Sequence, residues 1–254
     1  MLEVDHPHLR PTALERPAAD GGFIPGVPHG TTVLAMRFAD GVLMAGDRLA
    51  TEGHRVASRD MQKVYPTDGH SLVAIAGAAG PAVEMARMLR IELEHYEKIE
   101  GEPLELEGKA NKLSQMVRAN LPAAMQGLVV VPIFAGYDRR RRIGRLWKYD
   151  VTGGRYEEAE FEASGSGSLY ARESLKKAWH PELTRAEALV LALQALTDAS
   201  DEDRATGGVD LVRGIYPVIF HCTAEGAVEF SREEIEQTYR ERVAIARRPV
   251  AAGA

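Results

Sequence analysis

The chain has 254 residues, of which 45% are hydrophobic and 27% charged, and this composition suits one large globular domain rather than a disordered or fibrous protein. Its formal net charge of −6 argues against a protein that binds nucleic acid through a basic surface. Cys222 is the only cysteine, so an internal disulfide framework is excluded, and its place in the strand-like run YPVIFHCTAEG predicts a buried structural thiol.

The first thirty residues differ from the rest of the chain. They hold five prolines and four glycines without helical or alternating spacing, which predicts an extended leader. They lack the basic start and the apolar core of a signal peptide, and no run of eighteen apolar residues occurs in the chain. We therefore expect a cytoplasmic chain that makes no contact with a membrane.

Regular structure is predicted to begin at Thr31. The run TTVLAMRF, the turn ADG and the returning run VLMAGDRLAT predict a hairpin. A short strand around HRVA follows, and a DG turn then joins KVYPTDGH to SLVAIAG. Because SLVAIAG is apolar on both faces, we expect it to be a central strand that is covered on two sides.

Helices and further strands alternate in groups along the rest of the chain. The run Pro81–Glu97 repeats apolar residues at helical spacing, and a second helix is predicted from about Glu105 to Met125. Strands resume in LVVVPIFAGYD, RIGRLWKYD and YEEAEFEASG, and the basic run Arg139–Arg142 is expected to be a solvated hairpin tip. Helical spacing returns in LYARESLKKAW and TRAEALVLALQALTDAS, before two closing strands and a charged helix.

The order of these elements indicates the fold class. Strands, two helices, strands, two helices and strands favour an α+β fold, in which two antiparallel sheets face each other with a helix pair outside each. A parallel doubly wound sheet is less favoured, because strands and helices do not alternate one to one.

The junction between Gly30 and Thr31 is the first candidate for chemistry. A threonine at a chain terminus carries its own base, since an α-amino group has a pKa of about 7.7–8.0. Gly30 has no side chain to obstruct the bend that brings the Thr31 hydroxyl onto the preceding carbonyl. We interpret the junction as a cleavage site that frees Thr31 as a nucleophile. The alternative is that Thr31 and Thr32 are β-forming residues after a loop.

Two charged residues downstream favour the catalytic interpretation. Asp47 lies sixteen residues after Thr31 on the returning strand of the hairpin, and Lys63 lies another sixteen residues on. A lysine near Thr31 would lower the pKa of its amine and favour negative charge on its hydroxyl, and the aspartate would hold the lysine. Each residue alone is more often a surface charge, so the joint spacing is the signal.

Several ordered motifs resemble a known family. HGTTVLA, GVLMAGDRLAT, QKV, AIAGAAG, GSGS and DRATGGVDLVRGIYP are similar to segments of the β-subunits of the 20S proteasome, particularly the actinobacterial kind. The resemblance implies an N-terminal nucleophile hydrolase fold at residues 31–254, a four-layer αββα sandwich. It also implies that residues 1–30 are a propeptide removed by autocatalytic cleavage, and that the chain is a threonine endopeptidase.

The resemblance assigns catalytic roles by position. Thr31 would be the nucleophile, freed after Gly30, and Asp47 and Lys63 would complete the core triad. Three further residues would buttress the terminal amine and its proton path: Ser166, Asp203 and Thr206. The family often has serine where Thr206 stands.

Substrate contacts are implied in the same way. The Gly77 N–H would be an oxyanion donor, and the backbone groups of Thr51, Gly77 and Ala79 would pair with an extended peptide. The first specificity pocket would be formed by Ala50, Met61, Tyr65, Ile75, Ala79 and Val83. None of these residues is charged, so cleavage after large hydrophobic residues is predicted; for Tyr65 and Val83, ordinary core packing is an equal alternative.

One position departs from the family pattern. The family usually carries an arginine two residues after the aspartate, where this chain has Leu49. The missing charge puts the electrostatic balance around Lys63 in question, although it leaves the nucleophile in place.

The resemblance also implies an assembly. Seven β-subunits would form a ring, and two such rings capped by rings of α-subunits would give an α7β7β7α7 barrel. An ATP-dependent unfoldase ring would feed it with tagged or unfolded proteins, without any cofactor or metal in this subunit. Two alternatives are the simpler two-ring bacterial relative, which is shorter, and a non-catalytic structural β-subunit, which typically loses the Gly-Thr junction or the lysine.

Overall fold

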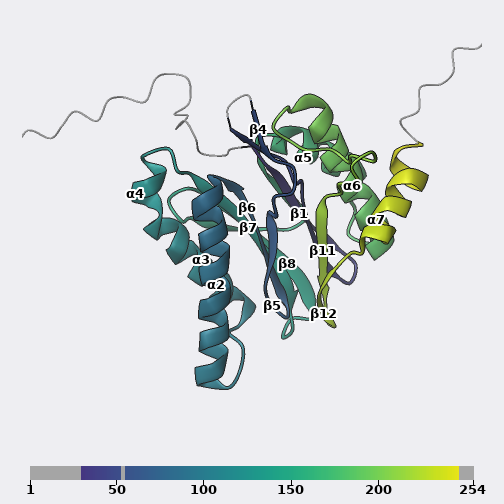
Figure 1. Cartoon of the computed structure of the whole chain (residues 1–254). Helices are drawn as coiled ribbons and strands as arrows, with labels where there is room; N and C mark the ends of the chain where they lie inside the picture. Colours follow the sequence, from purple (N-terminus) through teal and green to yellow (C-terminus); the bar gives the residue numbers. More distant parts are fainter. Residues whose placement is uncertain (1–29, 53–54, 246–254) are drawn as a thin grey trace, which may run out of the picture.

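The computed structural model describes residues 30–52 and 55–245 (Figure 1). The predicted leader, apart from Gly30, lies outside the described residues. Within them, the order of strand groups and helix pairs follows the prediction.

One five-stranded sheet has the order β10-β1-β2-β11-β12. Its strands are β1 (Thr32–Phe38), β2 (Gly41–Gly46), β10 (Phe161–Gly165), β11 (Val218–Thr223) and β12 (Gly226–Glu229). All neighbours are antiparallel, and β1 and β2 form the predicted hairpin with Phe38 opposite Gly41. The predicted return strand ends at Gly46, so Asp47 follows directly after it, and a separate short strand begins at Ala50.

The second five-stranded sheet has the order β5-β6-β7-β8-β9 and is also antiparallel throughout. Its strands are β5 (Val64–Asp68), β6 (Ser71–Gly77), β7 (Val130–Asp138), β8 (Ile143–Tyr149) and β9 (Arg155–Glu158). The run SLVAIAG is β6, which pairs with a strand on each side as predicted. A two-stranded sheet of β3 (Ala50–Glu52) and β4 (Arg55–Ser58) completes the strands of the described residues.

Helices cover the outer faces of both large sheets. One group contains α2 (Ala79–Glu100), α3 (Leu106–Ala119) and the short α4 (Leu121–Ala124). The other contains α5 (Ser168–Ala178), α6 (Arg185–Glu202) and α7 (Arg232–Thr238), which continues as a π-helical turn at Tyr239–Val243. The start of α6 is fixed by a capping box, in which Thr184 and Glu187 satisfy each other's free backbone N–H groups.

The second predicted helix, Glu105 to Met125, is interrupted in the structure. It ends as α3 at Ala119, and Asn120 separates it from α4. Pro122 explains the break, because proline has no N–H to bond the carbonyl four residues earlier and its ring crowds that carbonyl.

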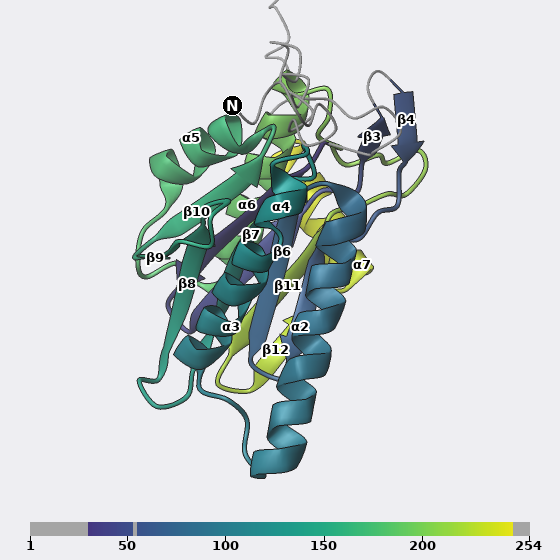
Figure 2. The same ribbon diagram turned by 90° about the vertical axis from the view of Figure 1, so that its left-hand side faces the viewer.

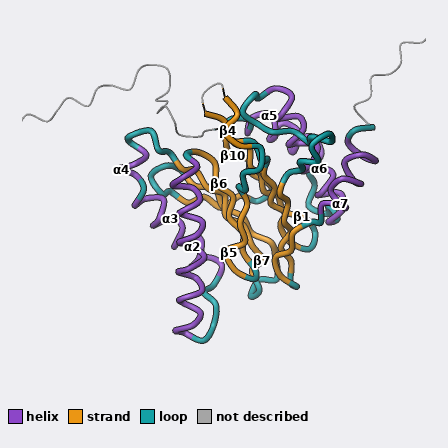
Figure 3. Tube along the Cα trace, in the orientation of Figure 1, coloured by secondary structure: helices purple, strands orange, loops and turns teal. Residues whose placement is uncertain are grey.

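Three apolar clusters hold the layers together. One fills the space between the two sheets, a second lies between α2 and α3 and the second sheet, and a third lies between the first sheet and α5 to α7. Figure 3 shows the strands between the two groups of helices, and Figure 2 shows α2 and α3 lying in front of the second sheet. The predicted four-layer αββα sandwich is confirmed.

Alternation along β1 shows how one strand serves two layers. Leu34, Met36 and Phe38 belong to the cluster under the helices, whereas Val33 and Ala35 belong to the cluster between the sheets. Successive side chains of a strand point to opposite faces, so residues of even number in β1 face the α5–α6 layer. This alternation also fixes the directions of the residues at the start of the strand.

Two smaller predictions concern single sites. Cys222 is fully buried in β11, and burial raises the pKa of its thiol to about 12. Residues Arg139–Arg142 form the exposed turn between β7 and β8, as predicted for a hairpin tip. Among the described helices, none combines the length and apolar composition needed to cross a bilayer.

Candidate active site

A buried ion pair lies where β2 ends and β5 begins. Lys63 Nζ is 2.6 Å from Asp47 Oδ1, and the side chains of Lys63 and Asp47 are 1% and 0% exposed. Asp47 follows β2 directly and Lys63 precedes β5 directly, so the pair joins the two facing sheets. The spacing in the sequence predicted that these charges would meet.

The hydrogen bonds of the pair match its ionised form. Lys63 Nζ donates to Asp47 Oδ1, to the Leu49 carbonyl at 2.5 Å and to the Gly30 carbonyl at 3.1 Å, which uses all three N–H groups of an ammonium. Asp47 also accepts backbone N–H bonds from Thr32, Leu49 and Gly207 at 2.8, 2.9 and 2.8 Å. The two carboxylate oxygens of Asp47 thus accept from four N–H donors in all, which leaves no free position for a proton.

Burial and mutual attraction act on the pair in opposite directions. Burial raises the pKa of the Asp47 carboxyl and lowers the pKa of the Lys63 amine, while the attraction between the two charges opposes both shifts. Removing either partner would leave the other charge buried and unpaired, which is costly. The two residues are therefore energetically a unit.

The Gly30 carbonyl lies between the candidate nucleophile and the lysine. The Thr31 hydroxyl donates to Gly30 O at 2.6 Å, and Lys63 Nζ is 3.1 Å from the same oxygen. Gly30 has a φ of +109°, and a Cβ there would lie 2.5 Å from the Thr51 hydroxyl. Only glycine fits this bend without strain, so the residue before Thr31 is constrained by shape as well as by conformation.

A second hydrogen-bonded group lies on the other side of Thr31. Asp203 Oδ2 accepts from the Ser166 hydroxyl at 2.5 Å and from the Thr206 hydroxyl at 2.6 Å. The backbone N–H of Ser166 donates to the Thr31 carbonyl at 2.9 Å. The structure thus brings together the three residues that the resemblance assigned to the surroundings of the terminal amine.

Thr32 contacts both groups, a position that the sequence motifs did not predict. Its N–H donates to Asp47, its hydroxyl oxygen is 2.5 Å from that of Thr206, and it is 0% exposed. The doubled threonine at residues 31–32 was the signal that could have indicated it.

The residues assigned to substrate binding come from three different elements. Thr51 is in β3, Gly77 ends β6 and Ala79 is the first residue of α2. Among the residues assigned to the specificity pocket, Ala50 and Ile75 are buried, Met61, Tyr65 and Ala79 are partly buried, and Val83 is 42% exposed on α2. Tyr65 and Ile75 pack in the cluster between the second sheet and α2, whereas the exposure of Val83 argues against a core position.

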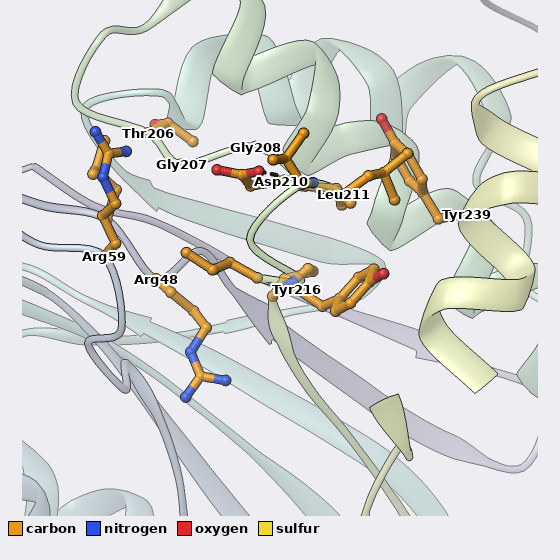
Figure 4. A pocket seen from close by; sticks show the side chains of 14 residues that line it. Arg48, Arg59, Thr206, Gly207, Gly208, Asp210, Leu211, Tyr216 and Tyr239 are labelled. Carbon is orange, nitrogen blue, oxygen red and sulfur yellow. Dashed lines mark hydrogen bonds between the residues drawn. The ribbon is translucent and has the colours of Figure 1, made fainter. Parts of the chain in front are cut away.

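Leu49 acts on the ion pair through its backbone. Its N–H donates to Asp47 and its carbonyl accepts from Lys63, so neither contact depends on the side chain that departs from the family pattern. The Leu49 side chain instead lines a pocket of about 510 Å³ beside the site. Figure 4 shows Thr206 and Gly207 at the edge of this pocket, with Arg48 and Tyr216 among the other lining residues.

These features define a class of protein. A four-layer αββα sandwich that brings a threonine, a buried lysine and an aspartate together at the start of a central strand has the architecture of the N-terminal nucleophile hydrolases. The class leaves the particular family open, because one fold supports many activities.

Comparisons with known proteins identify the family. A family model described as "Proteasome subunit" matches residues 27–212. The chain is 54% identical over 232 residues to the proteasome subunit beta of Acidimicrobium ferrooxidans, covering 89% of this chain and 85% of the relative. It is 51% identical to that of Streptomyces griseus (94% and 84% covered) and 50% identical to that of Acidothermus cellulolyticus (98% and 88% covered). The chain belongs to the proteasome family as a β-subunit, the threonine-type endopeptidase of that assembly.

Proposed function

We propose that this chain is a catalytically active β-subunit whose nucleophile is Thr31, freed by cleavage of its own Gly30–Thr31 bond. The observation that carries the proposal is the Gly30 carbonyl oxygen, which is 2.6 Å from the Thr31 hydroxyl and 3.1 Å from Lys63 Nζ. A non-catalytic ring subunit has no need of a buried lysine at that oxygen.

Self-cleavage would begin with the transfer of the Gly30 acyl group from nitrogen to oxygen within the chain. Thr31 Oγ1 attacks the Gly30 carbonyl carbon, the C–N bond breaks, and the proton of the hydroxyl ends on the Thr31 nitrogen, giving an ester and a free amine. The Lys63 ammonium lies where negative charge develops on the Gly30 oxygen and would stabilise it. Water then hydrolyses the ester, which restores the hydroxyl and releases residues 1–30 with a terminal carboxylate.

In the mature chain the same groups would act on a substrate. The Thr31 amine takes the hydroxyl proton, while Lys63 supplies positive charge beside it and is held in place by Asp47. Ser166, Asp203 and Thr206 hold the amine. The Gly77 N–H would bind the oxyanion, and the backbone of Thr51, Gly77 and Ala79 would pair with the peptide as an added strand.

The proposed cleavage preference follows from the apolar residues assigned to the first specificity pocket. The residues proposed for the first pocket carry no charge. Small Ala50 and Ala79 would leave room in it, and Met61 and buried Ile75 would give it an apolar wall. We expect cleavage after large hydrophobic residues. The partners proposed are α-subunits and further β-subunits in an α7β7β7α7 barrel in the cytoplasm, fed by an ATP-dependent unfoldase ring with tagged or unfolded proteins. Family membership supports the barrel.

The test combines mass and activity on the assembled α/β particle. We expect the β-chain to lose residues 1–30 and to begin at Thr31 by terminal sequencing, and peptide cleavage profiling to give products that end in large hydrophobic residues. The Thr31→Ala variant should enter the particle uncut and hydrolyse no peptide. Peptide hydrolysis by that variant would overturn the assignment of the nucleophile.

A further inference from the structure

The second threonine of the Thr31–Thr32 pair faces a different layer from the first. Thr32 is on the same face of β1 as Leu34 and Met36, which pack under α5 and α6. Thr31 is on the opposite face, together with Val33, which belongs to the cluster between the sheets. The Thr32 hydroxyl therefore lies toward the helix layer, where α5 begins after Gly167 and where Thr206 follows the end of α6.

The hydrogen bonds of this hydroxyl have one consistent direction. The carboxylate of Asp203 can only accept, so the Thr206 hydroxyl donates its single proton to Asp203 Oδ2 at 2.6 Å. Thr206 must then accept from Thr32 across the 2.5 Å contact between their hydroxyl oxygens. The Thr32 oxygen in turn accepts the backbone N–H of Gly167 at 3.1 Å.

The hydrogen bonds from Gly167 to Thr32, from Thr32 to Thr206 and from Thr206 to Asp203 form a relay, and its two threonines are closely packed. Thr32 is 0% and Thr206 is 4% exposed. A Cβ on Gly167 would lie 2.4 Å from Thr32 Oγ1 and 2.7 Å from Thr206 Oγ1, so only glycine leaves room for the two hydroxyls to meet. The backbone N–H of Thr32 also donates to Asp47 Oδ1 at 2.8 Å. One residue thus contacts the Asp47–Lys63 pair directly and the Asp203 group through Thr206.

We propose that Thr32 is a positioning residue of the catalytic site, whose buried hydroxyl holds Thr206 in the orientation that donates to Asp203. The proposal rests on the proposed function, in which Asp203 and Thr206 support the amine of Thr31. Thr32 itself touches no reacting atom. Its loss should lower the rate of the chemical step and leave substrate binding unchanged.

The experiment compares valine and serine at position 32 in the assembled α/β particle. Thr32→Val keeps the shape but removes the hydroxyl, and we expect kcat for a fluorogenic peptide to fall by about tenfold, the effect of one lost hydrogen bond, with KM within about twofold. Thr32→Ser restores the hydroxyl and should recover most of the rate. In a double-mutant cycle with Thr206→Val, the two losses should not add, because the first residue acts through the second.

The chain contains a matched control. Thr67 is 2% exposed, its hydroxyl lies 2.7 Å from that of Ser71, and Ser71 donates to Asp68 Oδ1 at 2.7 Å. This is the same relay of two hydroxyls and a carboxylate outside the site. Thr67→Val is expected to leave kcat and KM unchanged.

Several results would contradict the proposed role of Thr32. A Thr32→Val particle with the wild-type kcat, a serine variant as slow as the valine variant, or additive losses in the cycle would overturn the positioning role. Failure of Thr32→Val to enter particles that accept Thr206→Val would also overturn it, since the hydroxyl would then serve folding. If the wild-type chain is not cut before Thr31, the proposed function fails instead, and terminal sequencing separates the two cases.

Discussion

Replacing Lys63 with methionine tests the energetic coupling of the buried ion pair. Methionine keeps much of the length of the side chain and removes the charge, which leaves the Asp47 carboxylate 0% exposed with three backbone N–H donors but no counter-charge. Breaking a buried pair in this way costs about 3–5 kcal/mol. Because the three donors remain, we expect the lower end, about 3 kcal/mol of unfolding free energy.

The measurement is urea unfolding of the full-length chain in a Thr31→Ala background, so that no variant is cut. Lys98→Met is the control, since Lys98 and Glu94 are also 2.6 Å apart but are 70% and 55% exposed. That variant should lose far less, because water and salt screen an exposed ion pair. The Asp47→Asn/Lys63→Met double variant should lose less than the sum of the single variants. A Lys63→Met loss equal to that of Lys98→Met would refute the reasoning.

Three further predictions follow from single residues. Gly30→Ala introduces a Cβ at a φ of +109° in a crowded bend, so the uncut precursor should persist by intact mass, and wild-type processing would contradict this. The Cys222 thiol has a pKa of about 12 and is fully buried, so a thiol reagent at pH 8 should label the chain only after denaturation; labelling of the native chain would refute the buried position. The Thr152 hydroxyl and neighbouring donors lower the pKa of Asp150 from 3.8 to about 2. The stability difference between wild type and Asp150→Asn should therefore be present above about pH 4 and fade as the pH falls toward 2 in thermal unfolding, and a difference independent of pH would argue against these bonds.

The strand and helix pattern was predictable because each layer leaves a period in the sequence. The run SLVAIAG is apolar at almost every position because β6 is covered on both faces, and α2 repeats its buried residues at helical spacing. The break at Asn120 was missed because Leu121, Ala123 and Ala124 still favour a helix, and the constraint lies in one missing N–H at Pro122.

The candidate site was predictable where side chains carry the chemistry. Thr31, Asp47 and Lys63 stand out as residue types at a regular spacing. The contacts of Leu49 with the pair are made by its N–H and carbonyl, which every residue but proline possesses, so its identity carries no signal. Thr32 was missed for a related reason: a threonine in a strand is ordinary, and its partners Gly167 and Thr206 are more than a hundred residues away.

The opposed directions of the two threonines make the position of the chain end decisive. A chain cut one bond later would also begin with threonine and would carry the same amine and hydroxyl. Its hydroxyl, however, would point toward the layer of α5 and α6, where the Thr32 oxygen lies 2.5 Å from that of Thr206 and the residue is 0% exposed. Under the proposed maturation, the pleat of β1 therefore distinguishes two chain ends that carry the same chemical groups. Only the end at Thr31 has its hydroxyl beside the carbonyl that Lys63 contacts.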